Sequence, residues 1–303
     1  MRSEAVPAVI FDIAEKRGYR DVQLIGEGLE FRVFEALTAD KTKKVVLRCP
    51  AGDRFQTNAN DRYVDTRALL QWEYTVASHA AAHGIPVATP IDLIFGDIDV
   101  LVSDYVPDDG RGADQAGLGR LLRRLHAIPP PPAPSVAGGT APPAVVISQR
   151  INARWQELST AGPGLPEGFA ARELAAVLAG QPATSLVHLD VRSANLRCVS
   201  GRVLGLLDWS NALVGDPLLE LGRLAEFALL EGNGLDLDRI FAGYGAPADV
   251  LASDRPEMLV YRLDAAVMLA VVFLFEAPDD ALGRSALDRV LEVHARLSSV
   301  LHS

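Results

Sequence analysis

The sequence contains little cysteine and comparatively little positive charge. Its only cysteines, Cys49 and Cys198, show no metal-type spacing, and such sparse use fits a cytoplasmic protein. The 29 lysines and arginines are outnumbered by 39 aspartates and glutamates, which gives a formal net charge of −10. This acidic balance argues against a general binder of nucleic acid or anionic membranes, and it is compatible with a cationic substrate.

Long hydrophobic runs are also missing. Residues 1–20 alternate charged and apolar side chains and lack the apolar stretch of a signal peptide. The strongest apolar run, residues 265–275, has eleven positions, which is too short to span a bilayer. We therefore expect a buried helix there and no membrane contact. With 303 residues, 49% of them hydrophobic and 22% charged, the chain is large enough for two lobes with a buried core.

One stretch, residues 187–195 (VHLDVRSAN), is dense in oxygen-bearing side chains. The strands predicted around it are 185–187, 196–199 and 203–207. Ser-Gly at 200–201 provides a turn, so the last two strands form a hairpin. Asn195 then directly precedes the first strand of the hairpin, and Asp208 directly follows the second. Because the arms are antiparallel, these two side chains should lie side by side, with Asp190 on the preceding loop.

Those three side chains suit phosphoryl transfer. The reaction needs a cation that neutralises the phosphates and an acceptor group that positions the attacking hydroxyl. Magnesium prefers carboxylate and amide oxygens, and it binds through one or two carboxylates together with the phosphates. Asp208 and Asn195 supply such a pair, and Asp190 is directed at the same volume. The alternative interpretation is that these three residues have no catalytic role and are two ordinary loop aspartates and a turn asparagine, which are common at strand ends.

The complete pattern is His-x-Asp at 188–190, Asn195, Leu-Leu-Asp-Trp at 206–209 and Gly-Asp-Pro at 215–217. It resembles the aminoglycoside phosphotransferase family, which has the protein-kinase-like fold. The resemblance implies that Asp190 accepts the hydroxyl proton and that Asn195 and Asp208 hold Mg²⁺. The family usually has Gly where Leu189 stands, and a second His where Arg192 stands. Arg192 adds a cation that could contact phosphate or an anionic group of the substrate, or could simply be solvated.

The implied fold is α+β and bilobal. A small antiparallel-sheet lobe with one major helix is expected at 1–104, where it binds the nucleotide. A larger and mainly helical lobe is expected at 105–303, with the catalytic loop, the metal site and the substrate pocket. Gly26 and Gly28 lie between two strand candidates, and the resemblance places this glycine loop over the nucleotide phosphates, although two glycines alone equally suit a plain hairpin turn.

Arg48 ends a predicted strand at 45–48, where the fold normally offers a lysine to the phosphates. Arginine can still grip phosphate through two donors. Glu73 lies on the apolar face of a helix predicted at 65–83, and a carboxylate there needs a partner, so we predict an ion pair with Arg48. A solvated glutamate is the alternative. The resemblance also implies a hinge whose backbone binds the adenine edge, formed by Ser103, Asp104, Tyr105 and Val106.

Further strands are predicted at 85–94 and 99–105, and further helices at 5–17, 118–125, 146–158, 169–178, 218–230, 235–244, 256–275 and 281–301. The Pro-rich segment 129–143 is interpreted as an insertion within the second lobe. Among the acidic residues of the last helices, Glu226 and Asp264 are candidates for a pocket that receives amino groups of a substrate. Each could equally be a charge on a helix surface.

Only six residues separate Asp208 from Gly215, which leaves no room for the long segment that holds peptides in protein kinases. We therefore expect a kinase with a small acceptor and ATP or GTP as donor, acting as a monomer or homodimer without nucleic-acid or membrane partners. The resemblance favours an aminoglycoside or another antibiotic, and hence a role in antibiotic resistance. Choline, amino sugars and homoserine remain open as acceptors. The alternative from another functional class is a regulatory module that binds a nucleotide but catalyses no reaction.

Overall fold

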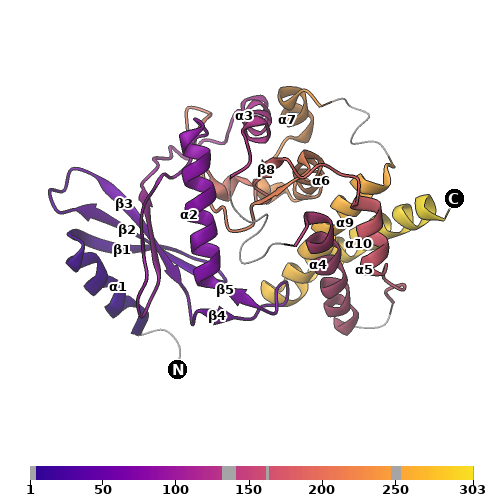
Figure 1. Ribbon diagram of the computed structural model, residues 1–303, viewed down its shortest axis with the longest axis horizontal. Helices are drawn as coiled ribbons and strands as arrows, with labels where there is room; N and C mark the ends of the chain where they lie inside the picture. The colour runs from indigo at the N-terminus through magenta and orange to yellow at the C-terminus, as the bar shows by residue number, and fades with distance from the viewer. Residues whose placement is uncertain (1–4, 132–140, 162–163, 247–253, 303) are drawn as a thin grey trace.

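The computed structural model describes residues 5–131, 141–161, 164–246 and 254–302. A five-stranded sheet lies at one end of the molecule and a mainly helical region at the other (Figure 1). All neighbouring strands are antiparallel, in the order β1-β2-β3-β7-β6. The strands are β1 (Tyr19–Glu27), β2 (Phe31–Thr38), β3 (Lys44–Pro50), β6 (Pro90–Ile94) and β7 (Val100–Asp104). The α+β architecture is confirmed, whereas a lobe boundary after residue 104 stays a prediction.

The two faces of this sheet are covered by different helices. Successive residues of a strand point to opposite faces, so Val100 and Val102 belong to one apolar cluster and Leu101 to another. Helix α1 (Ala5–Lys16) packs on the first face, and the major helix α2 (Thr66–Ala82) packs on the second. Asp65 caps α2, because its carboxylate accepts hydrogen bonds from the first backbone N–H groups of the helix. Two short strands not anticipated from the sequence, β4 (Phe55–Gln56) and β5 (Val64–Asp65), precede it.

The helical region confirms most of the predicted helices. Its α-helices are α3 (Gln115–Ala127), α4 (Pro143–Leu158), α5 (Ala171–Leu178), α6 (Pro217–Phe227), α7 (Leu237–Tyr244), α9 (Pro256–Val271) and α10 (Asp280–Leu301). Short 3-10 turns occur at Ser159–Ala161, Ser193–Asn195 and Glu231–Asn233. The Pro-rich insertion falls largely outside the described residues, and Pro143 begins α4, where its missing N–H costs no helical hydrogen bond.

Helix α9 continues as a π-helix, Val272–Glu276, and together they form the apolar core helix expected from the sequence. By length and composition alone, Pro256–Glu276 would be able to cross a membrane. However, 67% of its most apolar window is buried inside the protein, where α9 packs against α4, α6 and α10. Burial against its own chain explains the apolar composition, as in the core helices of other globular domains.

Helices α3 and α7 cross at a very short distance through two glycines. A Cβ atom on Gly119 would lie 1.9 Å from the carbonyl oxygen of Ile240, and one on Gly243 would lie 2.0 Å from that of Ala116. No side chain larger than hydrogen fits at either point. The glycines therefore let the two backbones touch, and they set the position of α3 behind the catalytic loop.

The predicted hairpin is confirmed in a small substructure that carries the catalytic loop. It consists of β8 (Ser185–Val187), β9 (Leu196–Val199), β10 (Arg202–Leu206) and β11 (Leu213–Gly215), of which β11 was not anticipated. Strands β9 and β10 pair with each other, as do β8 and β11.

The strand predicted at 85–94 is wrong in its first half, because only Pro90–Ile94 joins the sheet. The carbonyl of Pro86 instead accepts a hydrogen bond of 2.9 Å from the backbone N–H of Leu206. Val87 also forms a parallel bridge with Leu206. This segment therefore pairs with the catalytic hairpin, and it ties the sheet to the helical region.

Candidate active site

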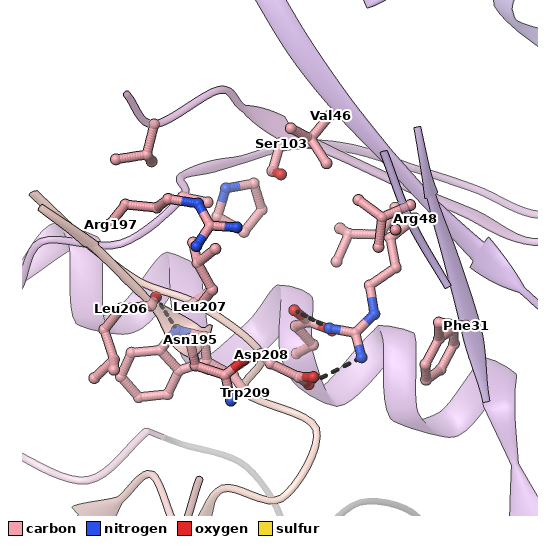
Figure 2. A pocket seen from close by; sticks show the side chains of 18 of the residues that line it. Phe31, Val46, Arg48, Ser103, Asn195, Arg197, Leu206, Leu207, Asp208 and Trp209 are labelled. Atoms are coloured by element: carbon pink, nitrogen blue, oxygen red, sulfur yellow. Dashed lines mark hydrogen bonds and ion pairs between the residues drawn. The ribbon is translucent and has the colours of Figure 1, made fainter. Parts of the chain in front are cut away.

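The predicted nucleotide-binding residues gather around one cavity between the sheet and the β9–β10 hairpin. The cavity has a volume of about 280 Å³. Predicted site residues in its lining are Gly26, Gly28, Arg48, Glu73, Ser103, Asp104, Tyr105, Val106, Asn195 and Asp208. Val46 and Leu206 supply apolar walls from the two sides, as a purine base requires. Figure 2 shows Arg48 and Arg197 on opposite sides of this cavity, with Asp208 between them.

Arg48 connects the sheet, helix α2 and the hairpin. Its Nη1 atom donates to Glu73 over 3.0 Å, and its Nη2 atom donates to Asp208 over 2.9 Å (Figure 2). The guanidinium also lies over the ring of Phe31, with 4.4 Å between the carbon of the guanidinium and the ring centroid. The predicted ion pair of Arg48 with Glu73 is confirmed, and the contact with Asp208 is an addition that the sequence pattern did not indicate.

The charges of this cavity shift the pKa values of its acids in different directions. Burial raises the pKa of Glu73 to about 7, although Arg48 opposes this effect. Burial also disfavours the charged form of Asp208, but the ion pair with Arg48 and a hydrogen bond from Ser210 outweigh it and hold the pKa of Asp208 below its usual range. The pKa of Glu30 is raised by burial and by the nearby charge of Asp208. Asp208 is therefore the carboxylate that stays ionised most readily.

The catalytic loop brings together Asp190, Arg192 and Asn195. The Nδ2 atom of Asn195 donates to Oδ2 of Asp190 over 2.6 Å and to the backbone carbonyl of the same residue over 2.9 Å. The Nε atom of Arg192 donates to Oδ1 of Asp190 over 3.1 Å, and the arginine side chain is 40% exposed. Both oxygens of Asp190 thus have one donor each, which fixes the orientation of the carboxylate.

Glu220 binds the backbone of this loop through its carboxylate. Its two carboxylate oxygens accept hydrogen bonds from the backbone N–H groups of His188 (2.5 Å) and Leu189 (3.0 Å). Burial alone would raise the pKa of Glu220, but hydrogen bonds and nearby His126 hold it below the usual range. A buried carboxylate with several donors is a rigid support.

His188 is fully buried, and its contacts are structural. Its Nδ1 atom accepts a hydrogen bond from the backbone N–H of Asp190 over 3.2 Å, so its Nε2 atom donates to the carbonyl of Leu207 over 2.9 Å. The burial of the ring lowers its pKa, which fits the neutral form with a single proton. His188 thereby connects the catalytic loop to the end of β10, directly before Asp208.

Two residues of the site have backbone angles that most side chains avoid. Leu189 has φ 65° and Asp208 has φ 61°. The left-handed region costs a residue with a Cβ atom about 1 to 2 kcal/mol, and residues held there often belong to functional sites. A glycine would adopt the conformation of Leu189 without this cost. Here the side chain of Leu189 is completely buried, which offsets part of the strain.

The oxygens of Asn195 and Asp208 suit a magnesium ion. Because the Nδ2 atom of Asn195 is directed at Asp190, its amide oxygen is left for another partner, and no described residue donates to it. Oδ2 of Asp208 likewise has no hydrogen bond within the described residues, since Arg48 and Ser210 both donate to Oδ1. The described part of the chain contains no cluster of three or more His, Cys, Asp or Glu residues that could hold a metal ion. A two-oxygen site fits Mg²⁺ held jointly with phosphates.

The two acidic candidates for a substrate pocket lie elsewhere, in buried ion pairs. Glu226 accepts hydrogen bonds from Arg262 (2.6 Å) and Arg289 (2.7 and 2.8 Å). Asp264 is completely buried among three arginines. The structure therefore corrects the expectation that these carboxylates form an open pocket for amino groups, because arginines of the same chain already occupy them.

Sequence reasoning missed three residues that belong to the site. Glu30 and Arg197 line the cavity, and Glu220 supports the catalytic loop. Arg197 alternates with two buried residues of β9, and this pattern could have shown that it faces away from the core. Glu220 follows Gly215 by five positions on an apolar helix, but only the fold shows which backbone it contacts.

A five-stranded antiparallel sheet with one major helix, a helical region and this catalytic loop together define the protein-kinase-like fold. The chain belongs to the phosphotransferase enzyme family (APH), whose model matches residues 21–261. It is a small-molecule kinase of that family.

Solved structures of similar fold include aminoglycoside phosphotransferase APH(4)-Ia, which is 17% identical with a TM-score of 0.60, over 98% of this chain and 99% of that one. The gentamicin complex of APH(2")-IIa is 12% identical with a TM-score of 0.64, over 98% and 99%. Macrolide 2'-phosphotransferase MphH from Brachybacterium faecium is 20% identical with a TM-score of 0.54, over 93% and 97%. No curated protein sequence matches this chain. At these identities the structural neighbours establish the fold.

Proposed function

We propose that this protein transfers the γ-phosphoryl group of ATP or GTP to a hydroxyl group of a small molecule, with Mg²⁺ as cofactor. The observation that carries the proposal is an unbroken set of contacts. Arg48 binds both Glu73 and Asp208, the backbone N–H of Leu207 donates to the carbonyl of Asn195, and the side chain of Asn195 binds Asp190. The phosphate-binding cation, the metal-binding oxygens and the acceptor for the hydroxyl proton are thereby positioned together.

The donor nucleotide is proposed to occupy the cavity between the sheet and the hairpin. Its base would lie between the apolar walls and meet the backbone of Ser103 to Val106, and its phosphates would lie beneath the loop of Gly26 and Gly28. Arg48 would bind the phosphates through its guanidinium, which is planar and permanently charged. A thermostable mutant of APH(4)-Ia is known in a complex with AMP-PNP and hygromycin B, which supports an adenine nucleotide as donor.

Asn195 and Asp208 are proposed to hold Mg²⁺ by their free oxygens. A magnesium ion at this place would neutralise charge on the phosphates during transfer. Arg48 keeps Asp208 ionised, and the contact with Asp190 keeps the amide oxygen of Asn195 directed outward. These two contacts prepare the ligand atoms before the nucleotide binds.

Asp190 is proposed to accept the proton of the attacking hydroxyl. The hydroxyl oxygen forms a new bond to the γ-phosphorus, the bond from that phosphorus to the bridging oxygen of the leaving diphosphate breaks, and the proton passes to a carboxylate oxygen of Asp190. The nucleoside diphosphate departs with its bridging oxygen. Arg192 and Asn195 orient Asp190 for this step by one hydrogen bond to each carboxylate oxygen.

The acceptor is the finer part of the proposal. Hygromycin B and gentamicin bound to structural neighbours support an antibiotic as the first compound to test, and with it a role in antibiotic resistance. Choline, amino sugars and homoserine form the second group. A polycationic acceptor normally requires exposed carboxylates, and Glu226 and Asp264 do not supply them.

The test is a transfer assay with Mg²⁺ and either ATP or GTP against these compounds, followed by the mass gain of one phosphate. Asp190→Asn should bind nucleotide normally and lose about 100- to 10,000-fold in turnover, as is typical for a missing general base. Asp238→Asn, which changes an exposed aspartate of α7, is the matched control and should keep full activity. Equal turnover by Asp190→Asn would overturn the assignment. Nucleotide binding without product from any acceptor would favour the regulatory module instead.

A further inference from the structure

Three arginines converge on a single buried carboxylate in the helical region. Arg150 and Arg154 of α4 both donate to Asp264 of α9, Arg150 through two nitrogens and Arg154 through Nη1 over 3.1 Å. Arg223 of α6 approaches the same carboxylate only to 3.8 Å. We call these four residues the Asp264 cluster. It contains three positive charges and one negative charge in a protein whose net charge is −10.

Arg223 is the member of the cluster that forms no hydrogen bond. Its guanidinium carbon lies 5.3 Å from the centroid of the Phe227 ring, and that ring cannot accept a conventional hydrogen bond from the buried Nε atom. The side chain of Arg223 is only 6% exposed, it donates no hydrogen bond to any described residue, and its Nε atom is completely buried. The Nε atom of Arg154 is buried without a partner as well. Burial lowers the pKa of both arginines, that of Arg154 to about 10. Unpaired buried donors and surplus positive charge are unfavourable unless an anion meets them.

A second buried carboxylate of the same region, Glu226, shows how many arginines are enough to pair a buried acid in this fold. Glu226 is 1% exposed and is fully paired by two arginines, Arg262 and Arg289. Asp264 is also fully paired by two, because Arg150 and Arg154 occupy both of its oxygens. Both oxygens of Asp264 are thus taken, and Arg223 is left with a buried donor that no described residue satisfies.

The cluster lies beside the catalytic loop. Arg223 follows Glu220 by one helical turn, and Glu220 binds the backbone of that loop. The charge of Asp190 is one of those that act on Arg223. Arg192 adds a further, 40% exposed guanidinium at Asp190. Asp61, in the loop between β4 and β5, is an acidic group that acts on Arg154.

We propose that the acceptor molecule carries an anionic group, a carboxylate or a phosphate, and that Arg223 binds this group together with Arg150 and Arg154 while Asp190 receives the proton of its hydroxyl. The inference rests on the proposed function and specifies its substrate class. A guanidinium presents parallel N–H donors that match both kinds of anion, and such charge-assisted pairs are among the strongest hydrogen bonds in proteins. Arg223 thereby acts as a specificity determinant for the acceptor.

The first experiment compares acceptors that differ only in the anionic group. Glycerol, glycerate and glycerol 3-phosphate share a three-carbon frame with a free hydroxyl, and glucose, glucuronate and glucose 6-phosphate form a second set. Glucosamine and kanamycin represent cationic acceptors. We expect kcat/KM to be about 10- to 100-fold higher for the carboxylate or the phosphate member than for the neutral one, and the preferred member identifies the source of the charge.

Variants of Arg223 test the same assignment. Arg223→Met should raise KM for the anionic acceptor about 10- to 100-fold and leave KM for ATP unchanged, while Arg223→Lys should recover part of the loss because it keeps the charge. Arg289→Met is the matched control, since it removes one of two arginines from Glu226. It should not change the preference among acceptors.

A binding measurement separates this inference from catalysis. With AMP-PNP and Mg²⁺ saturating the nucleotide site, malonate or inorganic phosphate should raise Tm of the native protein by about 2 °C or more, and should not do so in Arg223→Met. Transfer to neutral or cationic acceptors only would overturn the anionic subsite and leave the proposed kinase function intact. Tm increases that are equal in the native protein and Arg223→Met would overturn it as well. Anion binding at Arg223 without any transfer would instead contradict the proposed function.

Discussion

The Nη2 atom of Arg48 lies 2.9 Å from Oδ1 of Asp208, although the two residues are 160 positions apart in the chain. The same guanidinium binds Glu73 on α2. One arginine of the sheet thus connects the helix and the hairpin. It also neutralises the charge of Asp208, the proposed metal ligand, before a nucleotide is bound. A lysine with its single nitrogen could not bind two carboxylates in the same fixed, planar manner.

Asp208→Asn is expected to weaken the Mg²⁺-dependent binding of nucleotide. The variant keeps one ligand oxygen but loses the charge, so we expect a 10- to 100-fold higher Mg²⁺ concentration at half-saturation, of the order seen when a charged interaction is removed. Titration of Mg²⁺ at a fixed AMP-PNP concentration, followed by calorimetry, measures this. Asp238→Asn serves as the control, and an unchanged Mg²⁺ titration for Asp208→Asn would remove this residue from the metal site.

Glu220→Gln is expected to lower both stability and turnover. A glutamine has one acceptor oxygen and would direct its NH₂ group at a backbone donor of the catalytic loop, so the free energy of unfolding should fall by about 2 to 4 kcal/mol. Turnover should fall while nucleotide affinity changes little, because Asp190 loses its support. Urea unfolding and steady-state kinetics measure the two effects. Normal turnover in a folded Glu220→Gln protein would contradict the positioning role.

The pH dependence of stability should contain a contribution from Glu73. Its pKa is about 7 in the folded protein, whereas an ordinary glutamate has a pKa of 4.5, so between these values the folded state binds more protons than the unfolded state. Stability from this residue is therefore greatest at acidic pH and is lost as pH rises to about 7. Since a pKa unit corresponds to about 1.4 kcal/mol, the native protein should lose roughly 2 to 3 kcal/mol relative to Glu73→Gln between pH 5 and pH 8.

Urea unfolding of both proteins at the two pH values tests this expectation. Glu231→Gln, which changes an exposed glutamate, controls for effects of the substitution itself. A difference between native protein and Glu73→Gln that is the same at pH 5 and pH 8 would show that Glu73 does not titrate in this range.

Gly119→Ala is expected to destabilise the crossing of α3 and α7. The added Cβ atom would lie 1.9 Å from the carbonyl oxygen of Ile240, so the helices must separate, at a cost of about 3 kcal/mol or more. Thermal unfolding measures the loss. Gly180→Ala is the matched control, since nothing lies within 4 Å of its added Cβ atom and its Tm should remain near that of the native protein. A Tm for Gly119→Ala equal to that of the control would contradict the tight crossing.

Much of the fold could be predicted from local patterns. The hairpin around the turn at 200–201 and the helix that carries Glu73 follow from the alternation and spacing of apolar residues, which are properties of neighbouring positions. The segment at 85–89 was misjudged for the opposite reason. Its apolar residues suit a strand of the sheet, but they pair with Leu206, more than a hundred positions later.

The sequence by itself determined the motif with Asp190, Asn195 and Asp208 and the partnership of Arg48 with Glu73, because short spacing or a single unpaired charge on an apolar face restricts the possibilities. Only the tertiary structure decided that Glu226 and Asp264 are buried in ion pairs. Both look like helix-surface acids in the chain, and their burial depends on arginines supplied by distant helices. The pairing of charges in a packed interior depends on the whole arrangement of helices. The order of residues along the chain therefore does not show which charge remains unpaired.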